Sequence, residues 1–254
     1  MTATMHTPAA TPAQIDPMRR TSRAAGILYL ITFISIPTLA LYNPVRDNAD
    51  FVLGVGSDTA VLWGALSEVV VGLAGVGTAV VLFRVVRRQS ETAALGFVAS
   101  RIVEAAGILV GVVSLLSLVS LRDVAGTADA DPASLVTTGH SLLATYDSAF
   151  LLSQSLMPVF NALCLGYVMY RSGLVPRILP IIGLVGAPLL LASDILIFLG
   201  VIDRVSPFAA VAFIPIAVWE LSLGVYLTVK GFKPSPITAR PTPSIERHTE
   251  LTPA

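Results

Sequence analysis

Apolar residues dominate six long segments of this chain, and short polar stretches with arginine, glycine and proline separate them. The segments cover residues 24–42, 60–83, 95–120, 141–170, 178–200 and 208–229. A helix needs about 20 apolar residues to cross the hydrocarbon core of a bilayer. The pattern therefore predicts an all-α, polytopic membrane protein with six transmembrane helices in one bundle. The fourth segment is long enough to include an interfacial turn or a strong tilt.

The two ends of the chain differ from this pattern. Residues 1–18 and 234–254 are rich in threonine and proline and show no apolar periodicity. Such segments cannot bury enough apolar surface to offset the entropy of ordering. We expect two disordered tails around a transmembrane domain that covers residues 19–233.

Composition supports the membrane class and excludes several others. The chain is 54% hydrophobic and 13% charged, whereas soluble domains have about 25% charged residues. One cysteine excludes an internal disulfide, and three histidines are too scattered for a zinc site. The glycine-rich string "GLAGVGTAV" lies inside a span without a preceding strand, so it does not predict a nucleotide site. We expect no cofactor, no metal and no nucleic-acid partner, and an enzyme ranks behind other classes.

The basic residues are divided unequally between the two sides of the predicted bundle. The side with the N-terminus receives Arg19, Arg20, Arg23, Arg84, Arg87, Arg88, Arg101, Arg171, Arg177, Lys230 and Lys233. The other side receives only Arg46, Arg122 and Arg204. Because short cytoplasmic loops carry an excess of lysine and arginine, this division predicts that both termini are cytoplasmic.

The string "YRSGLVPRIL" predicts a tight hairpin between the fourth and fifth spans. Gly173 can take the left-handed conformation that ends a helix, and Pro176 can open the next one at its first turn. The hairpin-turn residues are Arg171, Ser172, Gly173, Pro176 and Arg177. The connection is so short that the two spans must be antiparallel neighbours.

Two further signals shape the fourth span. Asp131 followed by Pro132 is typical of a helix start, which predicts a short outer helix leading into the span. Pro158 lies deep inside the span and should kink it, because proline removes a backbone hydrogen bond.

Acidic residues occur inside the apolar spans, where each costs about 2.5–3.5 kcal/mol at a helix centre. They are Glu68, Glu104, Asp147, Asp194 and Glu220. Glu68, Glu104 and Glu220 share helix faces with small residues, which favour close helix packing. We therefore expect the acids to lie on packing seams rather than on lipid-facing ridges.

Arg101 lies one helical turn before Glu104 and predicts an intramembrane ion pair. We place this pair at the inner end of the third span, where Arg101 can extend toward cytoplasmic water. Glu68, Asp194 and Glu220 have no basic residue in their own spans. These three acids are candidates for binding a proton or another cation.

The fourth span carries a polar stripe, in which His140, Asp147, Gln154 and Asn161 recur every seven residues. Seven residues fall only about 20° short of two helical turns, so the four side chains share one slowly drifting face. The stripe either hydrogen-bonds to neighbouring helices as structural support or lines a path for a proton, an ion or a substrate. The candidate path combines Asp147, Gln154 and Asn161 with Glu68, Asp194 and Glu220.

Four strings carry a resemblance to a known family. They are "RRTSRAAGILYLI" at 19–31, "SRIVEAAG" at 100–107, "LGYVMYRSGLVPRILPIIGLVG" at 165–186 and "WELSLGVYLTVKGF" at 219–232. In this order they resemble a bacterial membrane-protein family described as domain of unknown function 4386. The matching residues are Arg101, Glu104, Arg171, Ser172, Gly173, Pro176, Arg177, Glu220, Lys230 and Gly231. The resemblance implies a multi-pass protein of the bacterial cytoplasmic membrane and brings no activity with it.

Two functional hypotheses remain. The first is a structural, sensory or assembly component whose buried polar groups lock helices together. The alternative is a small proton- or ion-coupled transporter with a polar path along the fourth span. In both cases the expected partners are the lipid bilayer and either a second copy of the chain or another membrane protein.

Overall fold

The structure is a computed structural model that describes residues 17–127 and 129–238, and within these ranges the chain forms helices and no strand. Most of the two predicted tails lies outside the described residues. Six helical stretches are long and apolar enough to cross a membrane. The prediction of an all-α protein with six such spans is confirmed.

Two of the spans are composite. The first consists of α1 (Pro17–Thr32), α2 (Ser35–Thr38), the 3-10 helix η1 (Leu39–Tyr42) and α3 (Asn43–Arg46). The fourth consists of α6 (Pro132–Phe150), the π-helical turn η3 (Leu151–Ser155) and α7 (Leu156–Ser172). The others are α4 (Asp58–Val86), α5 (Glu91–Ala125), α8 (Ile178–Phe198) and α9 (Pro207–Val229), and a short 3-10 helix η2 (Ala49–Leu53) precedes α4.

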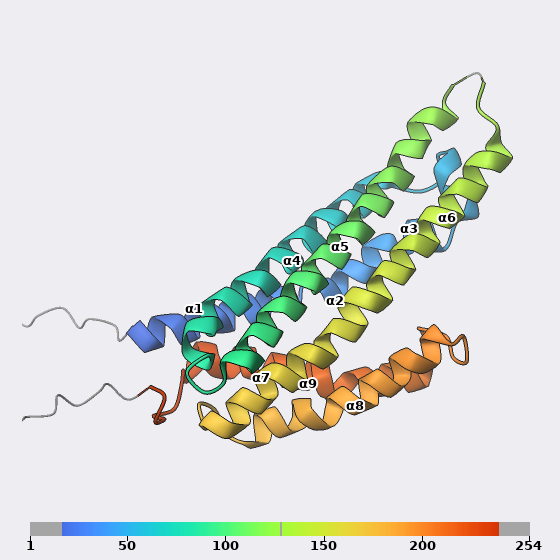
Figure 1. Ribbon diagram of the computed structural model, residues 1–254. Helices are drawn as coiled ribbons and strands as arrows, with labels where there is room; N and C mark the ends of the chain where they lie inside the picture. The colour runs from blue at the N-terminus through green and yellow to red at the C-terminus, as the bar shows by residue number, and fades with distance from the viewer. Residues whose placement is uncertain (1–16, 128, 239–254) are drawn as a thin grey trace, which may run out of the picture.

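The spans form a closed ring in chain order (Figure 1). Helix α1 packs on α4, α4 on α5, α5 on α6 and α7, α7 on α8, α8 on α9, and α9 returns to α1. An odd-numbered span is always beside an even-numbered one, so all neighbours in the ring are antiparallel. Short connections between consecutive spans favour this arrangement.

The spans differ greatly in length. At 1.5 Å per residue, α8 is about 30 Å long, α5 about 50 Å and the whole fourth span about 60 Å. Figure 1 shows that α5 and α6 project well beyond the loop that joins α8 and α9. At the tip, Asp131 caps α6 by accepting hydrogen bonds from Ala133 N and Ser134 N. Hydrogen bonds from Ser134 hold the pKa of the Asp131 carboxyl below its usual range.

The fourth span changes its helical winding just before Pro158. The π-helical turn Leu151–Ser155 precedes the proline, and α7 then continues through it. A proline in a regular helix collides with the carbonyl four residues earlier, and a wider turn makes room for it. The irregularity expected from Pro158 is therefore present as a π-helical turn.

The hairpin between α7 and α8 closes on Gly173, which has a φ of +67° and donates its N–H to Met169 O. Helix α8 begins at Ile178, two residues after Pro176, whose carbonyl accepts a bond from Leu179 N. Arg171 is exposed, and the Arg177 guanidinium lies 5.6 Å from the centre of the Tyr170 ring.

The segment after α9 folds back onto the same end of the ring. Lys233 N donates to Leu174 O, Ser235 Oγ donates to Ser172 O at 2.6 Å, and Arg88 Nη1 donates to Ile237 O. The expected tails therefore differ from the structure near their edges: residues 17 and 18 belong to α1, and residues 234–238 pack on the α7–α8 loop. The sequence alone does not reveal these contacts, because the segment has no apolar periodicity.

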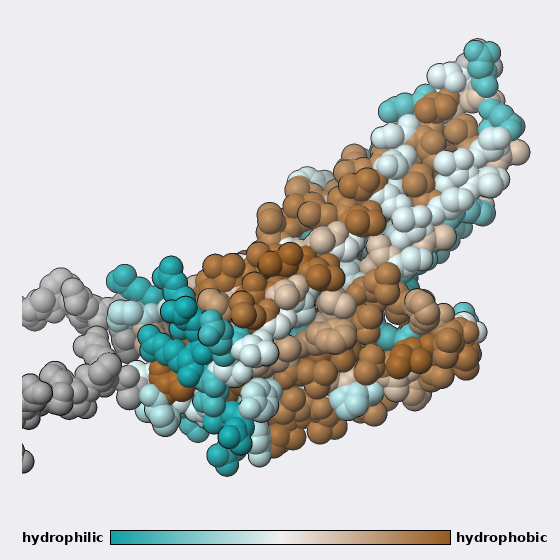
Figure 2. All heavy atoms as spheres, in the orientation of Figure 1, coloured by the Kyte–Doolittle hydropathy of each residue, from teal (hydrophilic) through white to brown (hydrophobic). Residues whose placement is uncertain are grey.

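Polar residues gather at the two ends of the molecule, with a hydrophobic surface between them (Figure 2). We call the end with Pro17 and residues 86–91, 172–178 and 229–238 the basic end. In the described chain this end holds Arg19, Arg20, Arg23, Arg84, Arg87, Arg88, Arg171, Arg177, Lys230 and Lys233, against one acid, Glu91. The opposite end is called the far end.

The ring closes where α1 crosses α9 at Gly26. A Cβ atom at Gly26 would lie 2.6 Å from Thr228 N and 2.7 Å from Gly224 O, both backbone atoms. At Gly72, on the contact between α4 and α5, a Cβ atom would have Ala105 Cβ as its nearest neighbour, at 3.6 Å. Of these two positions only residue 26 requires glycine, because backbone atoms of α9 lie where a Cβ atom would be.

We predict that Gly26→Ala destabilises the protein and that Gly72→Ala does not. The alanine methyl at residue 26 must push α1 away from α9, at a cost of about 1–3 kcal/mol. The free energy of unfolding in detergent micelles measures the difference. Equal stability of the two variants would show that α1 and α9 do not meet at Gly26.

One guanidinium organises the loop before α4. Arg122 donates to Phe51 O at 3.1 Å, to Gly54 O and Gly56 O at 3.0 Å, and to Val55 O at 3.3 Å. It also lies 4.4 Å from the centre of the Phe51 ring. Gly54 and Gly56 have φ values of +103° and +81°, a conformation that glycine adopts at little cost.

We predict that Arg122→Gln loosens residues 49–56 and lowers the free energy of unfolding by about 1–2 kcal/mol. Hydrogen–deuterium exchange of this loop should become faster, while exchange in the α7–α8 hairpin stays unchanged. Arg122→Lys should rescue only part of the loss, because an ammonium group lacks the guanidinium fork. Full rescue by lysine would show that the charge, and not the carbonyl contacts, holds the loop.

Candidate functional site: a charged centre inside the helix ring

The interior of the ring contains a buried guanidinium from α5. Arg101 is only 1% exposed, so bulk water and lipid hardly reach it. Its Nη1 atom donates to both carboxylate oxygens of Glu104, each at 3.1 Å. The two residues are three positions apart, which places them one above the other on the same helix face.

A second carboxylate reaches the same guanidinium from another span. Arg101 Nη2 donates to Glu220 Oε1 on α9 at 2.7 Å. Two rings enclose the group, with the Tyr29 centre at 5.2 Å and the Phe97 centre at 5.7 Å from the guanidinium carbon. One side chain therefore connects α5 with α1 and α9.

A short hydrogen-bond chain extends the centre to α7. Asn161 Nδ2 donates to Glu104 Oε2 at 2.6 Å, and Ser100 Oγ donates to Asn161 Oδ1 at 2.5 Å. The amide thus has both of its polar ends engaged with α5. Together, Arg101, Glu104, Asn161 and Glu220 join three spans at one depth, and we call these four residues the charged centre.

The structure corrects one expectation about this centre and adds a partner that the sequence did not predict. Arg101 does not extend toward water at the helix end, because Tyr29 and Phe97 cover it. Glu220 has no basic residue in its own span, but Arg101 on another span is its partner. A pattern within one span cannot reveal a partner that only the packing of spans supplies.

Glu68 on α4 lies in a second polar contact one level farther from the basic end. Tyr146 Oη donates to Glu68 Oε1 at 2.8 Å, and Gln154 Nε2 donates to the same oxygen at 3.3 Å. Glu68 is buried, and its Oε2 atom has no hydrogen-bond partner within the described residues. A carboxyl group placed in this way is at lowest cost when it is protonated.

Asp194 on α8 contacts the π-helical turn. Ser155 Oγ donates to Asp194 Oδ1 at 2.6 Å, while Oδ2 has no partner in the described part of the chain. Glu68 and Asp194 thus contact two consecutive residues of the fourth span, Gln154 and Ser155 respectively. Neither carboxyl is within ion-pair distance of a base among residues 17–127 and 129–238.

Asp147 forms the third level of contacts, at the far end. Arg46 Nη2 lies 2.6 Å and Arg204 Nη2 lies 3.0 Å from Asp147 Oδ1. Arg46 ends α3, and Arg204 lies in the loop between α8 and α9. Because α6 rises away from α8 and α9 (Figure 1), the Asp147–Arg204 ion pair bridges the opening between them.

The polar stripe of the fourth span therefore meets a charged or acidic partner at three of its four positions. Asp147 contacts Arg46 and Arg204, Gln154 contacts Glu68, and Asn161 contacts Glu104. His140 is exposed on the projecting part of α6.

Sequence reasoning missed four residues that take part in these polar contacts. Tyr146, Ser155, Arg46 and Arg204 were not among the predicted site residues. Tyr146 directly precedes Asp147, and the two arginines were counted only as charges of the outer loops. The seven-residue spacing could not have revealed them, because they come from other elements or lie beside the stripe.

A small cleft opens beside the charged centre. It has a volume of about 60 Å³, and its polar lining includes Arg101, Glu104, Glu220, Gln154, Thr32 and Ser35. Such a space holds a few water molecules but not a typical organic ligand, whose pockets measure about 300–1,000 Å³. The cleft brings one residue of the stripe, Gln154, together with two of the five acids.

The interior acids outnumber the bases that reach them. The five acids of the spans face three arginines, Arg46, Arg101 and Arg204. An isolated charge in an apolar interior is far costlier than a neutral acid. In the described residues no group of three or more His, Cys, Asp or Glu side chains is arranged to hold a metal ion. Glu68 and Asp194 are the two acids of the spans that have no ion-pair partner among the described residues.

These features define a multi-pass helical membrane protein with a charged centre buried among its spans. The model of one family, described as Domain of unknown function (DUF4386), matches residues 24–231. The chain belongs to this family, which confirms the resemblance seen in its sequence strings. No curated protein and no solved structure matches the chain.

We predict losses of stability of different size for the same substitution at two buried glutamates. Glu104→Gln replaces the carboxylate that accepts bonds from Arg101 and Asn161, and it should cost about 1.5–3 kcal/mol even though Glu220 still pairs with Arg101. Glu68→Gln should cost less than about 1 kcal/mol, because the glutamine carbonyl still accepts the bonds from Tyr146 and Gln154.

Unfolding of both variants in the same detergent measures this difference. Equal losses would show that Glu68 is ionised in the folded protein, or that Glu104 is not.

Proposed function

We propose that this protein is a small proton-coupled transporter of the bacterial cytoplasmic membrane, with both termini in the cytoplasm. The observation that carries the proposal is the excess of buried carboxyl groups around a water-sized cleft, at the level where Arg101 joins Glu104 and Glu220. Ten basic residues against one acid at the basic end support the orientation.

Glu220 is the proton-binding group in this proposal. Arg101 neutralises one carboxylate fully, so two ionised glutamates leave one negative charge in a low-dielectric space. Uptake of a proton by a carboxylate oxygen of Glu220 forms one O–H bond and removes this charge. Because a protonated carboxyl group no longer carries a charge opposite to that of the guanidinium, the Arg101–Glu220 contact loses its ion-pair attraction and weakens when the proton binds.

This weakening couples the proton to helix packing. The Arg101–Glu220 bond ties α9 to α5, and α8 follows α9 because the two pack along their lengths. At the far end, the Asp147–Arg204 pair holds the α8–α9 loop against α6. Movement of the α8–α9 pair would open the ring on the side of the cleft, which is the kind of gating that transporters use.

The second candidate function is a structural, sensory or assembly component. Its support is that three positions of the stripe contact charged or acidic side chains of other elements, and that the cleft is too small for an organic solute. In that case the polar contacts only fix the packing of the spans.

Proton flux separates the two candidates. We expect proteoliposomes with a trapped pH-sensitive dye to lose an imposed pH gradient faster than protein-free liposomes. Glu220→Gln should reduce the protein-dependent rate at least tenfold, because the amide cannot exchange a proton. Asp147→Asn should also change this rate, because it weakens the Asp147–Arg204 ion pair at the far end. Glu91→Gln, at an exposed acid of the basic end, is the matched control.

Unchanged flux in Glu220→Gln would remove this residue from the proposal. If wild-type protein and empty liposomes show the same rate while all variants fold, the structural alternative gains.

A further inference from the structure

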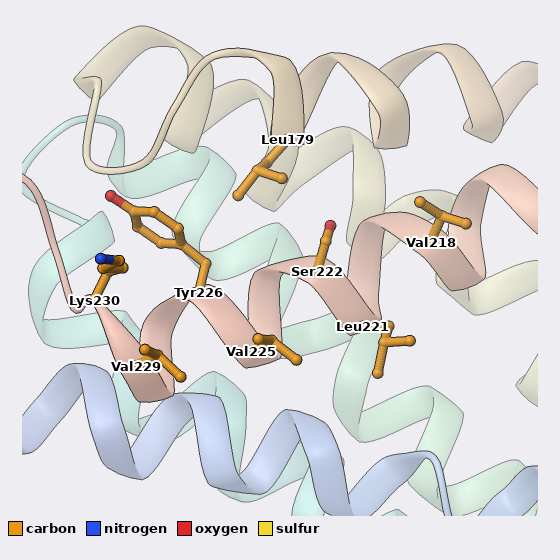
Figure 3. A pocket seen from close by; sticks show the side chains of 8 residues that line it. All are labelled: Leu179, Val218, Leu221, Ser222, Val225, Tyr226, Val229 and Lys230. Atoms are coloured by element: carbon orange, nitrogen blue, oxygen red, sulfur yellow. The ribbon is translucent and has the colours of Figure 1, made fainter.

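A groove of about 500 Å³ runs along the exposed surface of α9 toward the basic end of the molecule, and Leu179 of α8 borders it (Figure 3). Its apolar lining consists of Leu179, Val218, Leu221, Val225 and Val229. Four of these side chains, all on α9, are between 43% and 59% exposed at the protein surface. The groove is separate from the charged centre and shares no described contact with Arg101 or Glu104.

The polar groups of the groove are concentrated at one end. Figure 3 shows the Tyr226 hydroxyl and the Lys230 ammonium close to the same end, while Val218 and Leu221 lie at the other. The third polar group, Ser222 Oγ, already donates to Trp219 O at 3.1 Å. The groove thus has a cationic, hydrogen-bonding head and a long apolar remainder.

The length of the groove matches one leaflet of a bilayer. Val218 and Val229 are eleven residues apart on α9, which corresponds to about 17 Å along the helix. Half of the roughly 30 Å hydrocarbon core is about 15 Å. One lipid chain that begins at Lys230 would therefore reach the middle of the membrane along this surface.

The charge around the head of the groove favours an anion. Lys230 belongs to the basic end, where ten Lys and Arg residues face one acid in the described chain. Basic residues at a membrane surface attract anionic head groups. A second copy of the chain is disfavoured here, since two copies with the same orientation would bring their basic ends together.

We infer that this groove is a binding site for one anionic phospholipid. Its phosphate accepts bonds from the Lys230 ammonium and the Tyr226 hydroxyl, and one acyl chain lies along Leu221, Val225 and Val229. The inference is independent of proton transport, because it uses none of the residues of the charged centre.

Native mass spectrometry of the full-length protein in mild detergent tests this site. We expect the wild type to retain phosphatidylglycerol in preference to phosphatidylcholine when each is titrated separately. Lys230→Gln should weaken phosphatidylglycerol binding about fivefold, in line with one lost lysine contact at a membrane surface. Lys233→Gln, which removes an exposed lysine outside the groove, is the matched control and should have little effect.

A second variant tests the apolar part. Val225→Trp fills the groove and should abolish the retained lipid, whatever its head group. Equal retention of the two lipids, or the same loss in Lys230→Gln and Lys233→Gln, would overturn the inference. So would a dimer that Val225→Trp converts to a monomer, because the occupant would then be a second copy. Melting temperatures close to that of the wild type confirm that the variants are folded. If Val225→Trp does not fold, the comparison of Lys230→Gln with Lys233→Gln decides the test by itself.

Discussion

The contact between Arg101 and its two carboxylates is the constraint on which the rest of the structure depends. A guanidinium buried among apolar helices is stable only where opposite charges and hydrogen bonds surround it. Glu104 comes from the same helix, but Glu220 comes from the last span and Asn161, through Glu104, from the fourth. The final position of the third span therefore depends on contacts with both α9 and α7.

Ring closure follows from this requirement. Consecutive spans pack through short connections, yet the contact between α1 and α9 joins the first and last spans of the transmembrane region. Gly26 lets the two backbones approach, and Tyr29, one turn later, covers the guanidinium. The packing at Gly26 and the contacts of Arg101 thus favour the same arrangement of α1 beside α9. Such agreement between local and long-range interactions is expected of a sequence that specifies one fold.

The apolar periodicity of the sequence predicted much of this fold, but it could not predict the contacts between spans. Six apolar runs predicted the six spans, and the spacing of Asp147, Gln154 and Asn161 predicted one polar face. The partners of that face were beyond reach, because Arg46, Glu68 and Arg204 lie on elements whose rotation and depth the chain order does not specify. Arg101 illustrates the reason most clearly. Its position in the sequence suggested contact with water, whereas aromatic rings from α1 and α5 enclose it.

The unequal lengths of the spans have a consequence for the surrounding bilayer. Helix α8 is about as long as the hydrocarbon core is thick, whereas α5 is longer by more than half. Lipids beside α8 and α9 therefore meet a short hydrophobic wall, and lipids beside α4 and α5 meet a tall one. A bilayer adapts to such hydrophobic mismatch by local thinning, thickening or tilting of helices. We therefore expect the membrane to be thinner beside α8 and α9 than beside α4 and α5, and the energy of the protein to depend on the thickness of the membrane around it.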